Sequence, residues 1–250
     1  MVTQTLIPCV SDRSGTPSDD FTDAPPGPGK WLLGHDGTRF PLSWDALDVA
    51  LTTKTGKSAS DPSDYWTYNV DGVCYDIEDP VLPLTSDKQL LLDRISALSA
   101  FGSTSGALGT AWSWYTLSPK WSSIWTGASA PGPYSDLAPI GSKPPKLRKI
   151  AVLMTDGAYN TLRAWKDYDP AVVSGNAKQI CSNMKSAGIE VFTVGFDLDS
   201  LPADQKSRAI DTLQNCGTDL SHFYEALSAE QLKQSFRDIA MQLAQIFVAR

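Results

Sequence analysis

Short apolar runs and helically spaced apolar residues follow one another along the second half of the chain. Runs rich in β-branched, aliphatic and aromatic residues predict strands at 149–155, 189–196 and 222–225. Apolar residues at helical spacing predict helices at about 176–187, 203–214 and 229–247. Strands that alternate with helices in this way predict an α/β fold with a mainly parallel sheet and right-handed crossovers.

The predicted strand at 149–155 is apolar along its length instead of alternating, which indicates a buried central strand with helices on both faces. It ends on Asp156 and Gly157. Ligands bind at the carboxyl ends of the strands in open α/β sheets, and glycine lets the backbone turn close to a ligand. Asp156 is therefore a candidate binding residue. The alternative is an acid that only caps the next helix.

Two further helices are predicted before this strand. Asp87 is a good N-cap for a helix that runs to about Ser99. A second helix, at about 107–117, ends at Ser118-Pro119, because the residue before proline is disfavoured in the α conformation. Apolar residues form the expected buried stripe of the first helix at Leu90, Leu91, Ile95 and Leu98. They also share one face of the last helix of the chain, at Leu232, Phe236, Ile239, Leu243 and Ile246.

Residues 1–80 have no sustained helical period and are rich in Asp, Ser, Thr, Pro and Gly. Aromatic residues recur in this segment, which favours an ordered insertion over a disordered one. A second irregular loop spans residues 120–146. Aromatic pairs in these loops are candidates for exposed partner contacts, and the alternative is that they fill a small core under each loop. These pairs are Tyr65 with Trp66 and Trp121 with Trp125.

The net charge of −7 and the pI near 4.8 argue against a nucleic-acid partner, because no basic field is present to neutralise phosphates. No stretch approaches the ~20 apolar residues of a membrane span, and the first residues lack the order of a signal peptide. The four cysteines are not at zinc or redox spacings. They suit two disulfides in an oxidising compartment or four buried thiols in a cytosolic protein, and three disulfide pairings are possible.

Several motifs carry a resemblance to a known family. The segment 153–157, Leu-Met-Thr-Asp-Gly, followed after one helix by 188–196, resembles the second half of a von Willebrand factor A-type (vWA) domain, and 81–87 with Gly102-Ser103-Thr104 resembles the part just before it. More narrowly, the chain resembles TadG-like proteins, the vWA-bearing members of the TadE/TadG group of tight-adherence (Flp) pilus assembly. The segments that carry this narrower resemblance are 9–15, 22–27, 112–119 and 236–240.

The resemblance implies a metal-ion-dependent adhesion site, in which three loops at the carboxyl edge of the sheet hold a divalent cation, usually Mg²⁺. Thr104 matches the threonine of the second loop, and Asp156 matches the aspartate of the third. Hydroxyl and carboxylate oxygens are hard ligands that suit Mg²⁺. A coordination position left to the carboxylate of a partner would make the cation a bridge between proteins, which is binding and not catalysis.

The first loop of such a site, Asp-x-Ser-x-Ser, is expected after the first strand and before a long helix. Asp12 and Ser14 imitate it, but the proline- and glycine-rich segment 25–29 that follows cannot supply that helix. We therefore expect the chain to begin inside the domain, past the first strand and past the transmembrane helix that a longer form would carry. The predicted organisation is an irregular insertion at 1–80 and the C-terminal part of a vWA (Rossmann-like) domain at 81–250, with a partial metal site.

The resemblance to a periplasmic domain also favours a disulfide between Cys181 and Cys216. Cys9 and Cys74 bracket the insertion, and a bond between them would close a long loop whose entropy in the unfolded state is otherwise large. The resemblance places the protein on the periplasmic or cell-surface side of a bacterial envelope, with the proteins of a pilus or secretion apparatus, or a surface ligand, as partners. The expected function is a non-enzymatic binding or adhesion module.

The alternative function is a metal-dependent hydrolase that uses Asp156 with Asp197 or Asp199, since acids at successive strand ends can line one crevice. Against it, the sequence has no nucleophile elbow, no phosphate-binding glycine loop and no histidine near these acids. His222 opens the predicted edge strand, and we expect a packed or capping role for it.

Overall fold

The structure is a computed structural model, and it describes residues 21–24, 31–33, 38–40, 81–98, 104–139, 141, 143–159 and 169–248. The chain divides into two compact units. One comprises residues 1–102, 118–131 and 162–167, and the other comprises residues 103–117, 132–161 and 168–250. Within the described residues, every helix is too short or too polar to cross a bilayer.

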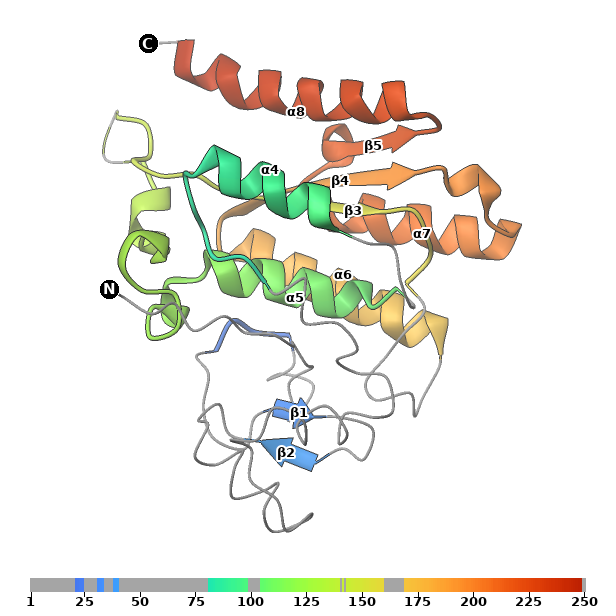
Figure 1. Ribbon diagram of the computed structural model, residues 1–250, viewed down its shortest axis with the longest axis horizontal. Helices are drawn as coiled ribbons and strands as arrows, with labels where there is room; N and C mark the ends of the chain where they lie inside the picture. The colour runs from blue at the N-terminus through green and yellow to red at the C-terminus, as the bar shows by residue number, and fades with distance from the viewer. Residues whose placement is uncertain are drawn as a thin grey trace. The chain divides into compact units, whose positions relative to one another are not determined.

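The second unit is built on a parallel sheet of three strands, in the order β3-β4-β5 (Figure 1). The strands are β3 (Lys149–Thr155), β4 (Ile189–Phe196) and β5 (Phe223–Ala226). The register pairs Lys149 with Ile189 and Thr155 with Gly195, so β3 and β4 end at the same edge. The predicted α/β class and parallel sheet are confirmed, and the arrangement is compatible with a Rossmann-like fold.

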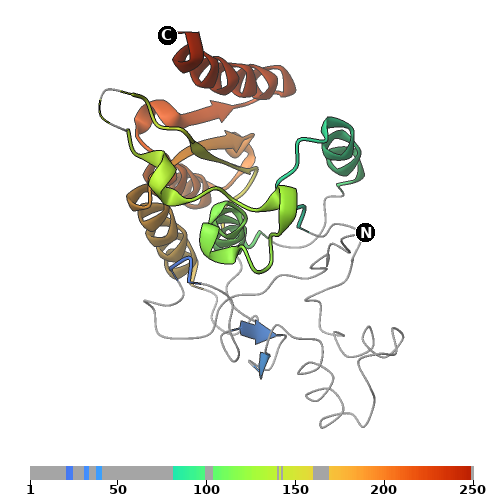
Figure 2. The same ribbon diagram turned by 90° about the vertical axis from the view of Figure 1, so that its left-hand side faces the viewer.

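Helices cover both faces of this sheet. Helices α5 (Gly106–Leu117), α6 (Pro170–Ser186) and α7 (Ala203–Cys216) form one layer, and α8 (Ala229–Val248) lies on the opposite face. Figure 2 shows α8 and the layer of α5 and α6 on opposite sides of the strands. The second unit therefore has three layers, as parallel sheets require to bury both faces.

Helix α6 begins several residues earlier than the sequence predicted. The Asp169 carboxylate accepts a hydrogen bond of 2.9 Å from the Ala171 N–H, and Pro170 occupies the first turn, where a missing N–H costs nothing. Gly175, which the prediction treated as loop, lies within the helix. Gly188 follows the helix with a φ of +84°, the left-handed conformation that glycine commonly adopts just after a helix C-terminus.

The core lies on the two sides of β4. Towards α8, Phe192 and Val194 pack with Ile239, and the half-buried Leu232 and Leu243 join them. Towards α7, the cluster is made by Ala158, Leu198, Ala209 and Leu213. Of the predicted stripe on α8, Phe236 is an exception at 42% exposure, and the side chain of Ile246 lies outside the described residues.

A disulfide joins Cys181 of α6 to Cys216 of α7, and both residues are fully buried. This is the pairing that the resemblance implied, and it excludes four free thiols. The predicted partners Cys9 and Cys74 lie outside the described residues.

Strand β3 differs from the prediction of a strand covered on both faces. Lys149, Ala151, Leu153 and Thr155 are buried, whereas Val152 and Met154 on the α8 side are 38% and 53% exposed. The reason is position: among the described residues β3 is an outer strand of the sheet, and α8 packs over β4 and β5.

In the first unit, α4 (Lys88–Ala97) begins as predicted. The Asp87 carboxylate accepts a hydrogen bond of 3.0 Å from the Leu90 N–H. The predicted buried stripe is wrong, because no residue of α4 is buried and Ile95 and Leu98 are 64% and 66% exposed. Helical spacing predicts an apolar face, but burial also needs a partner surface.

The first unit also contains a short antiparallel pair of strands and a loop with an aromatic core. Strands β1 (Trp31–Leu33) and β2 (Thr38–Phe40) pair antiparallel. Trp121 and Trp125 are 0% and 3% exposed, so they fill a core and are not surface contacts. Tyr65 and Trp66 lie outside the described residues.

Candidate functional site

Asp156 stands at the carboxyl edge of the sheet, directly after β3, and it is exposed. The Thr155 hydroxyl shapes the turn that follows. It accepts a hydrogen bond of 3.2 Å from the Gly157 N–H and donates one of 2.9 Å to the Gly157 carbonyl. Asp156 does not cap the next helix of the described chain, since Asp169 is the N-cap of α6. The predicted strand-end position of the acid is confirmed.

Thr104 lies beside this turn. Its Oγ1 is 3.7 Å from the position that a Cβ on Gly157 would take, in ordinary van der Waals contact. Thr104 precedes α5 by two residues, so the loop before α5 and the loop after β3 meet at this point. The structure therefore brings the segments of the two sequence-predicted ligands together.

Gly106 and Tyr159 hold these two loops in place. A Cβ on Gly106 would lie 2.0 Å from Cδ1 of Tyr159, so the tyrosine ring rests directly on the first residue of α5. The ring is buried at 6% exposure. Burial raises the pKa of Tyr159, and its side-chain hydrogen bond with Thr110 partly opposes that increase. Sequence reasoning missed this pair, because a lone Gly-Tyr contact has no local signal.

Gly106→Ala is expected to lower the free energy of unfolding by about 1–3 kcal/mol, because the new methyl group overlaps a buried ring. Chemical denaturation of the purified chain measures it. Gly109→Ala is the matched control: it lies in the same helix with no atom within 4 Å of its added Cβ. The control should be stabilised by up to about 1 kcal/mol, because alanine favours helix. Equal effects at both positions would contradict the packing argument.

Two further acids lie near the same edge. Asp197 follows β4, adopts a left-handed φ of 49°, and donates its N–H to the Ala226 carbonyl at 2.8 Å. Asp199 is held in an ion pair with Lys206, which raises the pKa of that lysine. A lysine partner neutralises Asp199, so it is a poor candidate for the general base of the hydrolase alternative.

The potential ligands at the carboxyl edge of the sheet are of the chemical type that Mg²⁺ prefers, but the described residues supply few of them. Thr104 offers a hydroxyl and Asp156 a carboxylate, both hard oxygen ligands. Among the described residues, no group of three or more His, Cys, Asp and Glu residues gathers in a way that could hold a metal ion. Asp12 and Ser14, the imitation of the first loop, lie outside the described residues. The described pair alone leaves most of an octahedral shell to water or to other ligands.

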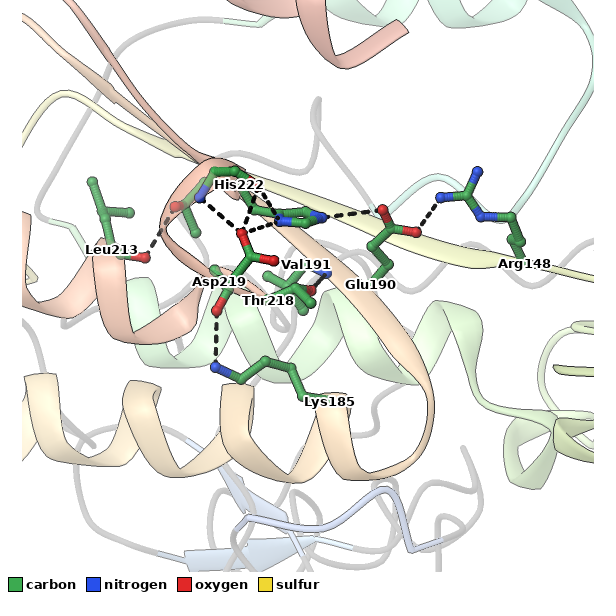
Figure 3. Close-up of polar contacts among 11 residues, drawn as sticks. Arg148, Lys185, Glu190, Val191, Leu213, Thr218, Asp219 and His222 are labelled. Atoms are coloured by element: carbon green, nitrogen blue, oxygen red, sulfur yellow. Dashed lines mark hydrogen bonds and ion pairs between the residues drawn. The ribbon is translucent and has the colours of Figure 1, made fainter. Parts of the chain in front are cut away.

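A second polar cluster lies at the opposite, amino-terminal edge of the sheet (Figure 3). His222 lies between two carboxylates, with Nδ1 2.8 Å from Asp219 and Nε2 3.2 Å from Glu190. Arg148 donates to the other oxygen of Glu190. The His222 ring also packs on Phe192, with 4.5 Å between the ring centroids. The packed role predicted for His222 agrees with this geometry, and the cluster ties together the residues that begin the three strands.

The hydrogen bonds of this cluster predict that the folded state loses stability at low pH. Hydrogen bonds from Ser221 and His222 lower the pKa of Asp219 from 3.8 to about 2. The resulting stabilisation is present above pH ~4 and is lost as the pH falls towards 2, where the carboxylate is protonated in the folded state. Thermal melting from pH 6 to pH 2 should therefore show a smaller acid-induced drop for Asp219→Asn than for the wild type. Asp93→Asn, at an exposed acid on α4, should keep the wild-type drop. Identical profiles for all three proteins would contradict the prediction.

Comparison of the chain with protein-family models and with curated proteins gave no match. Fold and site together define an α/β protein with a hydroxyl and a carboxylate at the carboxyl edge of its sheet.

Proposed function

We propose that the chain is a non-enzymatic binding module of the vWA type, in a TadG-like protein of bacterial pilus assembly or surface adhesion. The observation that carries the proposal is the position of the Thr104 hydroxyl beside the turn of Asp156-Gly157, 3.7 Å from where a Cβ on Gly157 would lie, at the carboxyl edge of a parallel sheet. The buried disulfide supports an oxidising compartment, such as the periplasm or the cell surface.

The chemistry proposed for the site is a cation bridge. Thr104 and Asp156 would supply two oxygen ligands to Mg²⁺, and a carboxylate of the protein partner would complete the contact. Two ligands from the described chain hold Mg²⁺ weakly, because this cation gives up its waters reluctantly. Other ligands would come from residues outside the described part of the chain or from the binding partner.

Metal binding tests this proposal. Titration of the chain with Mn²⁺, followed by electron paramagnetic resonance, should show weak binding, in the millimolar range typical of sites with few ligands. Asp156→Ala and Thr104→Ala should each weaken it at least about tenfold. Asp199→Ala is the matched control, since this acid lies near the same edge and is paired with Lys206. Binding that is unchanged in Asp156→Ala would refute the site.

The second candidate function, a hydrolase, is favoured only by the placement of Asp156 and Asp197 after neighbouring strands that end in register. Generic ester and phosphate substrates, with and without Mg²⁺, separate the two functions. We expect no turnover. Turnover that is lost in Asp156→Ala would replace the binding module with the enzyme.

A further inference from the structure

Helix α5 and strand β3 are neighbours that are fastened together at both ends. At the start of β3, Lys149 is 4% exposed and its Nζ donates to the carbonyl of Leu117, the last residue of α5, at 2.6 Å. Past the other end of β3, the ring of Tyr159 rests on Gly106, the first residue of α5. The helix and the strand are therefore antiparallel, and at about 1.5 Å per residue the two contacts lie roughly 16 Å apart along α5.

The contact at the Tyr159 end has two parts. A Cβ on Gly106 would overlap three atoms of the tyrosine ring, so the ring lies flat on the glycine. The Tyr159 hydroxyl also forms a hydrogen bond with Thr110, whose own hydroxyl donates to the Gly106 carbonyl at 2.8 Å. A threonine hydroxyl has one hydrogen, so Thr110 accepts from Tyr159. Ring and hydroxyl together hold the first turn of α5.

The two sequence-predicted ligands are each a few residues from this contact. Thr104 precedes Gly106 by two residues, and Asp156 precedes Tyr159 by three. The Thr104 hydroxyl is 3.7 Å from the position of a Cβ on Gly157. Mg²⁺ requires near-ideal octahedral geometry with oxygens at about 2.0–2.1 Å. Ligands from two different loops can therefore bind one cation only if the loops are held at a fixed separation.

We propose that Tyr159 is a positioning residue of the candidate site, which keeps Thr104 beside the turn of Asp156 by fixing the start of α5. Its hydroxyl is used within the helix, so it is not a metal ligand and acts through Gly106. Without this contact the start of α5 is released while Lys149 still holds the far end. The effect on cation binding rests on the proposed function, whereas the effect on the separation of the loops does not.

The first experiment measures the proximity of the two loops in the full chain, with a chelator present. Thr104→Cys combined with Gly157→Cys should form a disulfide, because these side chains would lie in contact and the bond needs Cβ atoms about 3.5–4.5 Å apart. In a glutathione buffer, the fraction of linked peptide gives the equilibrium constant of this bond, and mass spectrometry separates it from bonds of the native cysteines. Adding Tyr159→Ala should lower that constant at least about fivefold.

Two further variants separate positioning from a general loss of stability. Lys149→Ala removes a buried side chain at the other end of α5 and should leave the disulfide constant unchanged. Tyr159→Phe keeps the ring and should lower the constant by about twofold, and it decides the result if Tyr159→Ala does not fold. A constant that is unchanged in both tyrosine variants would overturn the proposal. An equal decrease in Lys149→Ala would also overturn it.

The second experiment follows Mn²⁺ binding by electron paramagnetic resonance. Tyr159→Ala should weaken binding by about the same factor as Thr104→Ala, and the double variant should bind no more weakly than Thr104→Ala, because the tyrosine acts only through the threonine. Additive losses in the double variant would contradict a positioning role. If the wild type binds no Mn²⁺ while Tyr159→Ala still lowers the disulfide constant, the metal function fails and the positioning role of Tyr159 stands.

Discussion

Replacing Cys181 and Cys216 with alanine is expected to lower the free energy of unfolding by about 3–4 kcal/mol. The disulfide closes a segment with a sequence separation of 35, and a cross-link of this span removes that much chain entropy from the unfolded state in the loop-closure description. Both residues are fully buried between α6 and α7, so the bond also fixes the layer of helices on that face of the sheet.

Urea denaturation monitored by circular dichroism measures this change. The single variant Cys181→Ala is the informative control. It already lacks the cross-link, so it should lose most of the stability that the double variant loses, and the remaining difference should reflect only the packing of the Cys216 thiol. A double variant with the wild-type denaturation midpoint would show that the bond does not stabilise the fold.

The strands and most helix ends could be predicted from local sequence, because the signals act over a few residues. Local signals determine structure at three positions: the apolar run forms strand β4, the Asp87 carboxylate caps the start of α4, and the left-handed Gly188 follows the end of α6. The start of α6 could not be placed well, since Gly175 suggested a loop while the cap at Asp169 decided the boundary.

Burial could not be predicted from the same patterns. The stripe of α4 and the second face of β3 are as apolar as the sequence suggested, yet Leu98 and Met154 are exposed. An apolar pattern shows which face of a helix or strand is suited to burial. Whether that face is buried depends on the elements that pack against it in three dimensions.

The candidate site, too, could be predicted from local sequence only in part. The strand-end position of Asp156 follows from the sequence, but only the family resemblance connected it with Thr104, which lies far away along the chain. The structure joins the two loops through the packing of Tyr159 on Gly106. The polar cluster of Glu190 and His222 also depends on long-range contacts, and one acid in an apolar strand was its only sequence signal.

Phe192→Ala is expected to lower the free energy of unfolding by about 3–5 kcal/mol, the usual cost of removing a buried aromatic ring. Phe192 is fully buried in the middle strand of the described sheet, where it packs with Ile239 of α8 and against the ring of His222. Its loss therefore weakens the attachment of α8 and the support of the polar cluster together.

Denaturation of Phe192→Ala and Phe192→Leu separates cavity formation from a general loss of apolar character. Leucine fills much of the space, so its variant should lose clearly less stability than the alanine variant. Leu220→Ala is the surface control, because Leu220 is 74% exposed and should change stability by less than about 0.5 kcal/mol. If the alanine variants of Phe192 and Leu220 lose equal amounts of unfolding free energy, the packing of α8 on the sheet does not depend on Phe192. Other contacts would then have to hold α8 on the apolar face of the sheet.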